Sequence, residues 1–198
     1  RVESPHIINC SVIDGTVEGN EQVGGFIGFA SSGSQILHCI SNVTVIGDFS
    51  VGGFIGDGGG IIHSCTVTSS ITGSNVVGGL IGYAGENVQI TSSSAVSNFE
   101  FSEPWTGGLV GRFDSGNITD CYAGSILSAN GDVGGIVGDV YHSVNITNGY
   151  SIGLITAENS YRLDSENGGI VGSSRTEGNI TITNSVALMQ SVDGSSPT

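Results

Sequence analysis

The sequence predicts an all-β fold, a right-handed parallel β-helix of about seven coils, each of roughly 28 residues. Three observations lead to this prediction. A Gly-Gly-apolar-apolar-Gly unit occurs six times, a column of isoleucines keeps step with it, and a small residue follows three positions after each of those isoleucines. Two columns that stay in step over most of a chain indicate a structural repeat.

The glycine unit defines the repeat length of the chain. Its copies start 28, 26, 29, 27 and 34 residues apart, at 24–28, 52–56, 78–82, 107–111, 134–138 and 168–172. Between them lie short β-branched segments separated by Gly, Asn, Asp and Ser, with no helical period, which is typical of strands and turns. We therefore expect three short strands in each coil, as in 24–28, 36–41 and 43–47.

Stacked coils would pair each strand with its copy in the next coil, in parallel and in register, about 4.8 Å apart. The repeated residues then form ladders. The isoleucine column is Ile7, Ile36, Ile62, Ile90, Ile118, Ile146 and Ile182, and the small column is Cys10, Cys39, Cys65, Ser93, Cys121, Gly149 and Ser185. The residue before each small one is always polar, which places it outside and predicts a bend between the two columns.

The glycine unit itself leaves two alternatives, because neighbouring side chains of a strand face opposite ways and yet both central residues are apolar. A local bend can turn both inward, which we favour. Otherwise one of them forms an outward aliphatic stripe, an assembly surface made of Ile27, Ile55, Ile81, Val110, Val137 and Val171.

We expect one solenoid over residues 1–198 that starts and ends in mid-coil, with loop insertions at 98–106 and 157–167. Both insertions precede a glycine unit, so both should emerge from one edge. Loops on a rigid scaffold often carry binding residues. The candidates for stacking on sugar rings or anchoring a protein, unless they fold back over apolar surface, are Phe99, Phe101, Trp105, Tyr161 and Arg162.

Composition excludes some functions. Four arginines, no lysine and eighteen acidic residues give a net charge of −14, which argues against binding nucleic acid or an anionic membrane. No apolar run is long enough to span a bilayer, and no N-terminal signal pattern is present. Charged residues make up only 11% of the chain, so solubility depends on Ser, Thr, Asn and exposed backbone.

Residues 107–126, GGLVGRFDSGNITDCYAGSI, resemble the GLUG repeat of bacterial secreted and surface proteins, and the glycine unit extends the resemblance over nearly the whole chain. The resemblance implies an extended stalk or interaction region, as in adhesin-like proteins and immunoglobulin A-cleaving metallopeptidases. The chain departs from the pattern where Ser93, Gly149 and Ser185 replace the cysteine. No H-E-x-x-H motif is present, so the peptidase activity is not implied here.

Catalysis is not expected, and neither is a cofactor or a metal site. β-Helix lyases and hydrolases need clustered carboxylates, usually beside a basic residue. Here Asp14, Asp48, Asp132 and Asp193 lie near one corner beside glycines, as turn formers do. His38 and His63 lie in adjacent coils, where a polar surface ladder is favoured over a metal or acid–base pair.

The cysteine and asparagine columns suggest two covalent features. Cys10, Cys39 and Cys65 stack at a distance that permits a disulfide, but parallel side chains point the same way, so buried thiols are the default and one bridge stays open. Sequons for N-glycosylation begin at Asn9, Asn42, Asn117, Asn145 and Asn179, each of which can also be an ordinary turn residue.

The sequence thus predicts a structural or adhesive module of an extracellular, cell-surface or fibre-forming protein that assembles through its ends and edge loops. The alternative is a carbohydrate-binding or carbohydrate-active β-helix. Expected partners are copies of itself or neighbouring solenoid segments, and carbohydrate or a cell-surface protein. The repeat also places Arg112 between Tyr83 and Asp139, which predicts an ion pair with Asp139 and stacking on Tyr83.

Overall fold

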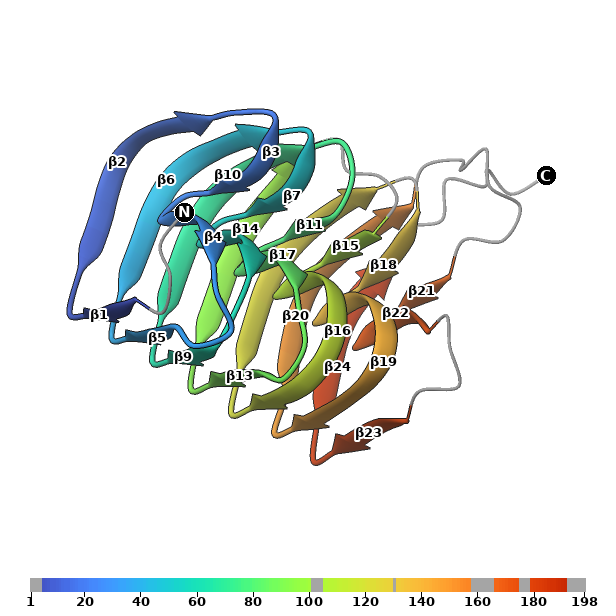
Figure 1. Cartoon of the computed structure of the whole chain (residues 1–198). Coiled ribbons are helices and arrows are strands. Elements are labelled where there is room, and N and C mark those ends of the chain that lie inside the picture. The colour runs from blue at the N-terminus through green and yellow to red at the C-terminus, as the bar shows by residue number, and fades with distance from the viewer. Residues whose placement is uncertain (1–4, 101–104, 130, 158–165, 175–178, 192–198) are drawn as a thin grey trace.

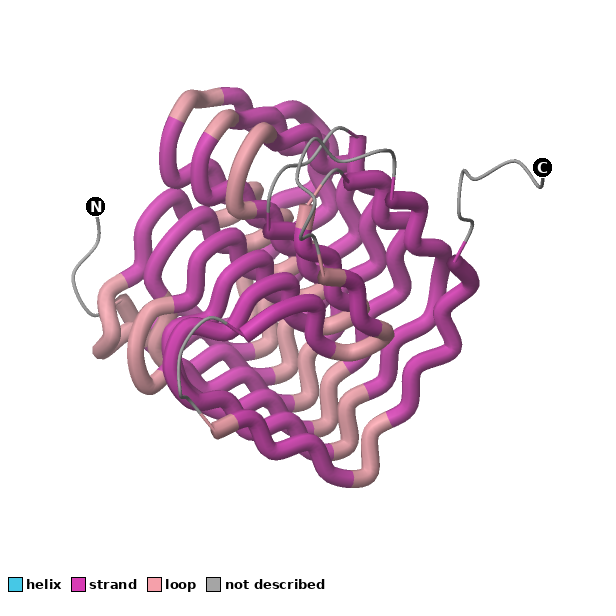
Figure 2. Tube along the Cα trace, turned by 90° about the vertical axis from the view of Figure 1, so that its right-hand side faces the viewer, coloured by secondary structure: helices cyan, strands magenta, loops and turns pink. Residues whose placement is uncertain are grey.

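The computed structural model describes residues 5–100, 105–129, 131–157, 166–174 and 179–191 as a stack of coils (Figure 1). Each strand pairs in parallel with its copies in the adjacent coils, and three sheets result. The described residues contain no helix, and therefore none that could span a membrane (Figure 2). The predicted all-β parallel solenoid is confirmed.

Sheet B, the longest face, has seven strands: β2 (Ser11–Glu18), β6 (Ile40–Gly47), β10 (Thr66–Gly73), β14 (Ser94–Glu100), β17 (Tyr122–Ala129), β20 (Tyr150–Ala157) and β24 (Val186–Ser191). Sheet C has six: β3 (Glu21–Gly24), β7 (Phe49–Gly52), β11 (Val77–Gly78), β15 (Trp105–Gly107), β18 (Asp132–Gly134) and β21 (Asn167–Gly168).

Sheet A has eleven strands in two stacks. The stack that carries the isoleucine column contains β1 (His6–Ile8), β5 (Gln35–Leu37), β9 (Ile61–His63), β13 (Val88–Thr91) and β23 (Ile180–Thr183). The stack that follows the glycine units contains β4 (Ile27–Ala30), β8 (Ile55–Gly58), β12 (Ile81–Ala84) and β22 (Val171–Ser174). The long strands β16 (Val110–Thr119) and β19 (Val137–Thr147) run through both stacks and join them.

Two details of the predicted coil need correction. A coil has four strand segments where three were expected, because the glycine unit is divided between the end of sheet C and the start of sheet A. The count of seven coils is also not matched. About five turns, from β1 to β19, are described almost continuously, while the sixth is interrupted at 158–165 and the seventh is represented by β23 and β24 alone.

The isoleucine column is an internal ladder, as predicted. Its members are paired in register from Ile7 to Ile182. The five central isoleucines are fully buried, whereas Ile7 is half-buried and Ile182 is 45% exposed, because each of them lies in a terminal coil.

The bend after the isoleucines is made by the polar column, whose seven residues all have φ between 48° and 56°. This left-handed conformation is unfavourable for most side chains, and Asn and Asp tolerate it best. The corner compensates through hydrogen bonds along the axis. Ser64 N, for example, donates to Thr91 O of the next coil at 3.0 Å. The column is Asn9, His38, Ser64, Ser92, Asp120, Asn148 and Asn184.

A second bend lies within the glycine unit. Phe54 N and Ile55 N donate to the same carbonyl, Leu80 O, at 3.1 and 2.9 Å, and both side chains are fully buried. The chain therefore bends between these two residues, and their side chains both face inward. The outward aliphatic stripe is wrong, since Ile27, Ile55, Ile81, Val110 and Val137 are buried and Val171 is half-buried.

The paired glycines cross the interior of each coil and touch the inner face of sheet B. A Cβ on Gly79 would lie 2.1 Å from Gly108 O and 2.9 Å from Ala95 Cβ, so no side chain fits there. Ser41 Oγ fixes the crossing by donating to Gly53 O at 2.8 Å. The crossing separates two apolar cores, one between sheets A and B and one between sheets B and C.

The crossing generates a test. Gly79→Ala should lower the free energy of unfolding by about 3 kcal/mol, because the new methyl group meets backbone of the adjacent coil that cannot move aside. The matched control is Gly85→Ala, since a Cβ on Gly85 meets nothing within 4 Å. Urea denaturation followed by circular dichroism should show a change within about 0.5 kcal/mol for the control. Equal losses in the two variants would contradict this account of the glycines.

Candidate functional site

A seam of polar and aromatic side chains runs along the outside of the solenoid where the second stack of sheet A borders sheet C. Residues at one position of successive strands form its sheet A side: Phe29, Asp57, Tyr83, Arg112, Asp139 and Ser173. Sheet C contributes Gln22, Trp105 and Asp132, each within reach of this column. The glycine units position the seam, because Gly82 packs against the backbone of Ser50 and Val51 with no room for a Cβ between the strands.

Arg112 is the centre of the seam. Its Nε lies 3.6 Å from Asp139 Oδ2, and its guanidinium carbon lies 5.9 Å from the centre of the Tyr83 ring. The predicted ion pair and the contact with Tyr83 are both confirmed. Two further rings lie closer, Tyr141 at 4.6 Å and Trp105 at 5.1 Å. The side chain of Arg112 is 21% exposed and that of Asp139 is fully buried, so the arginine balances a carboxylate that water does not reach.

The sequence did not predict that either of these rings contacts Arg112. Tyr141 follows Asp139 by two residues on one strand and so faces the same side, a period-two signal that would have found it. Trp105 lies in sheet C, on the other side of the bend in the glycine unit. Its distance from Arg112 depends on the angle of that bend, which residue spacing along the chain does not give.

One coil further, two buried carboxylates share a serine. Ser173 Oγ lies 2.9 Å from Asp132 Oδ2 and 2.9 Å from Asp139 Oδ1. Asp132 Oδ1 also accepts a hydrogen bond from Glu166 N at 3.0 Å. These carboxylates link the last coils. Asp132 therefore takes part in a hydrogen-bond network, in addition to forming a turn as the sequence suggested.

At the other end of the seam, burial raises the pKa of Asp57, although Gln22 Nε2 donates to its Oδ2 at 2.8 Å. Burial also raises the pKa of Tyr83, and the hydrogen bond from its hydroxyl to Asp114 adds to the effect. Tyr83 is therefore a neutral hydrogen-bond donor at neutral pH. The seam thus presents a partly exposed guanidinium among half-buried rings, while its carboxylates contact protein groups.

Of the five predicted ligand-binding residues, the structure describes Phe99 and Trp105. Phe99 is 3% exposed and packs in the core between sheets B and C, where no ligand reaches it, because its strand position alternates inward. Trp105 is half-buried beside Arg112. Phe101, Tyr161 and Arg162 lie outside the described residues.

The four cysteines are free thiols, so the disulfide considered for Cys10, Cys39 and Cys65 is not formed. In-register side chains point the same way, and each thiol instead donates to a backbone carbonyl, such as Cys39 Sγ to Leu37 O at 3.2 Å. Burial raises the pKa of Cys65 and of Cys121 to about 11. Stability from these two neutral thiols is therefore present below pH 9 and is lost as the pH rises through 11.

His38 and His63 contact each other across adjacent coils. The rings of His38 and His63 meet edge to face at 5.5 Å, and His63 Nδ1 lies 2.8 Å from Thr91 Oγ1. Within the described ranges, no group of three or more His, Cys, Asp or Glu side chains is arranged to hold a metal ion.

The sequon asparagines differ in accessibility. Asn9, Asn42, Asn145 and Asn179 are exposed, and Asn117 is half-buried. Asn117 Nδ2 donates to Gln89 Oε1 at 2.9 Å, and Asn145 Nδ2 donates to Asn117 Oδ1 at 2.9 Å. These two asparagines thus form an amide ladder in addition to being sequons.

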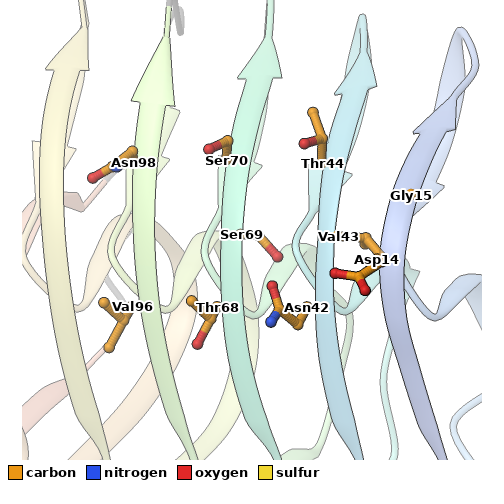
Figure 3. Close-up of a pocket in the computed structure, with 10 residues that line it drawn as sticks. All are labelled: Asp14, Gly15, Asn42, Val43, Thr44, Thr68, Ser69, Ser70, Val96 and Asn98. Carbon is orange, nitrogen blue, oxygen red and sulfur yellow. The ribbon is translucent and has the colours of Figure 1, made fainter.

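A shallow depression of about 280 Å³ lies on the outer face of sheet B (Figure 3). It forms where β2 has an extra residue between Ile13 and Thr16, with Asp14 and Gly15 at φ of 61° and 116°. Its lining is mostly uncharged and polar: Asp14, Gly15, Asn42, Val43, Thr44, Thr68, Ser69, Ser70, Val96 and Asn98.

Comparison with known proteins shows a similarity to halomucin. Over 192 aligned residues the chain is 29% identical to halomucin of Haloquadratum walsbyi (strain DSM 16790 / HBSQ001), and the match covers 90% of this chain. The chain spans only 2% of the length of halomucin. No family model matches the chain, so the GLUG resemblance is not confirmed.

The Arg112 pair can be tested by a double-mutant cycle. Arg112→Leu should lower the free energy of unfolding by about 3 kcal/mol, because it leaves a buried carboxylate without its cation. In the background of Asp139→Asn, the same substitution should cost less than about 1 kcal/mol. Urea unfolding of the wild type, both single variants and the double variant measures the coupling. Additive losses would show that the ion pair contributes nothing.

Thiol labelling tests the cysteine column. At pH 8 in native buffer, iodoacetamide should modify Cys10 rapidly and leave Cys39, Cys65 and Cys121 unmodified, because those three are buried. In concentrated urea all four should react. Peptide mass spectrometry identifies the modified residues, and native labelling of Cys65 as fast as that of Cys10 would contradict the burial.

Proposed function

We propose that the chain is a rigid structural segment of an extracellular surface protein. The observation that carries the proposal is that every recurring column serves the stacking of one coil on the next. The isoleucines fill the core, the left-handed corners bond along the axis, and the glycines let strands meet without side chains. A structure of this kind lengthens by adding coils and needs no other partner to do so.

The similarity to halomucin supports the location. The name denotes a mucin, an extracellular glycoprotein, and the match with a small part of a far longer protein fits a segment of a repeated or extended architecture. Exposed sequons at Asn9, Asn42, Asn145 and Asn179 fit a glycosylated surface.

The proposal includes an assembly or adhesive role, because parallel strands that pair edge to edge along the solenoid axis can pair in the same way with a neighbouring solenoid segment. The role proposed here includes no catalysis, because the seam carboxylates of Asp132 and Asp139 are held by Ser173 and Arg112.

Carbohydrate binding is the second candidate, and the ring cluster around Arg112 favours it. A partly exposed guanidinium beside Trp105 and Tyr141 resembles the pairing of donors and ring faces that binds sugars. Retention on insoluble polysaccharides that is lost in Trp105→Ala would support this candidate over a purely structural role.

The location is tested on intact cells that produce the protein. Antibody raised against the 198-residue chain should label the cell surface, and brief protease treatment of unbroken cells should remove the label while a cytoplasmic control protein stays intact. Label that survives the protease and appears only after lysis would refute the extracellular assignment.

A further inference from the structure

The outer face of sheet B is unusually apolar toward its C-terminal strands. Large aliphatic side chains stand in solvent on four neighbouring strands: Val96 (47% exposed), Ile126 (52%), Ile152 (38%), Val186 (50%) and Leu188 (56%). The strands β14, β17, β20 and β24 that carry them are consecutive in the sheet, so the side chains form one continuous patch. Patches of this kind on soluble proteins mark interaction sites.

Two tyrosines flatten the same patch. The rings of Tyr122 and Tyr150 stack at 5.5 Å with 18° between their planes. A Cβ on Gly124 would lie 2.5 Å from the Tyr122 hydroxyl and 3.0 Å from its Cζ, so that ring lies across the glycine and against the sheet. The face therefore combines exposed aliphatic side chains with a tyrosine ring that lies flat on the sheet.

Charge is almost absent from this face, in a chain whose net charge is −14. The strands β6, β10, β17, β20 and β24 contain no charged residue. The acidic residues of sheet B are Asp14 and Glu18 in β2 and Glu100 at the end of β14. Two copies of the chain repel each other through their acidic surfaces, and this repulsion is weakest when the two faces of sheet B meet.

We propose that the outer face of sheet B binds the same face of a second copy of this chain, related by a two-fold axis. Seven strands about 4.8 Å apart and six to eight residues long, at about 3.3 Å per residue, span on the order of 800 Å². A stable protein interface needs about 800 Å² from each partner, so the face is large enough. Sheets packed face to face about 10 Å apart are an established geometry for such surfaces.

The contact differs from growth through the sheet edges. A two-fold face-to-face contact uses the same surface on both copies and closes at the dimer, whereas pairing at edges continues without limit. The inference does not depend on where the protein resides, so it stands or fails separately from the proposed surface role.

Sedimentation equilibrium of the 198-residue chain from about 1 μM to about 1 mM tests the pairing, and we expect a closed monomer–dimer equilibrium. The double variant Ile126→Glu/Leu188→Glu should raise the dissociation constant at least about 100-fold. The matched control is Ile8→Glu/Ile61→Glu, which changes side chains that are 50% and 43% exposed on sheet A. The control should change the constant less than about 3-fold.

Thermal unfolding by circular dichroism shows whether each variant is folded, and Ile126→Ser/Leu188→Ser replaces the glutamate pair if that pair is not. A wild-type chain that stays monomeric throughout overturns the proposal, including the case in which the face binds a polysaccharide instead. So does a mass that rises past the dimer without limit, or a dimer that the control weakens as much as the sheet B variant.

Discussion

The close passage of the paired glycines across each coil is the constraint on which the rest of this solenoid depends. Backbone packs directly against backbone within the glycine units. Sheet C and the second stack of sheet A therefore approach so closely that Gly82 touches the main chain of Ser50 and Val51. The interior is thereby split into a larger apolar core between sheets A and B and a smaller one between sheets B and C. A wider crossing would open both cores at once, so the glycines fix the cross-section of every coil.

The sequence predicts best what repeats along the axis. Identical columns give the register, so the isoleucine ladder, the polar corner and the neighbours of Arg112 in adjacent coils were all predictable. What lies across the coil is set by the angles of the bends, which the repeat does not encode. The contact of Trp105 with Arg112, the burial of Phe99 and the division of the glycine unit between two sheets belong to this second kind.

The same distinction explains where charge is found. Inside the seam, the buried carboxylates of Asp139 and Asp132 contact Arg112, Ser173 and a backbone N–H, and these partners come from neighbouring coils. Because the stacked coils already fix the backbone positions of these partners, pairing them costs less conformational entropy than pairing two side chains on an open surface. The seam therefore links the last coils to one another.

The outward positions of sheet B show which side chains the fold requires there, because one column contains chemically different residues in successive coils. Asn42, Thr68, Val96, Gly124 and Ile152 occupy equivalent positions on five consecutive strands, so stacking sets no demand on the side chain there. Outward charges are accepted elsewhere, as at the Asp120 corner and at Glu21 of sheet C. Folding therefore does not explain why five strands of this face exclude charge. A requirement outside the folded coil explains it better, and contact with an uncharged surface of matching shape is such a requirement.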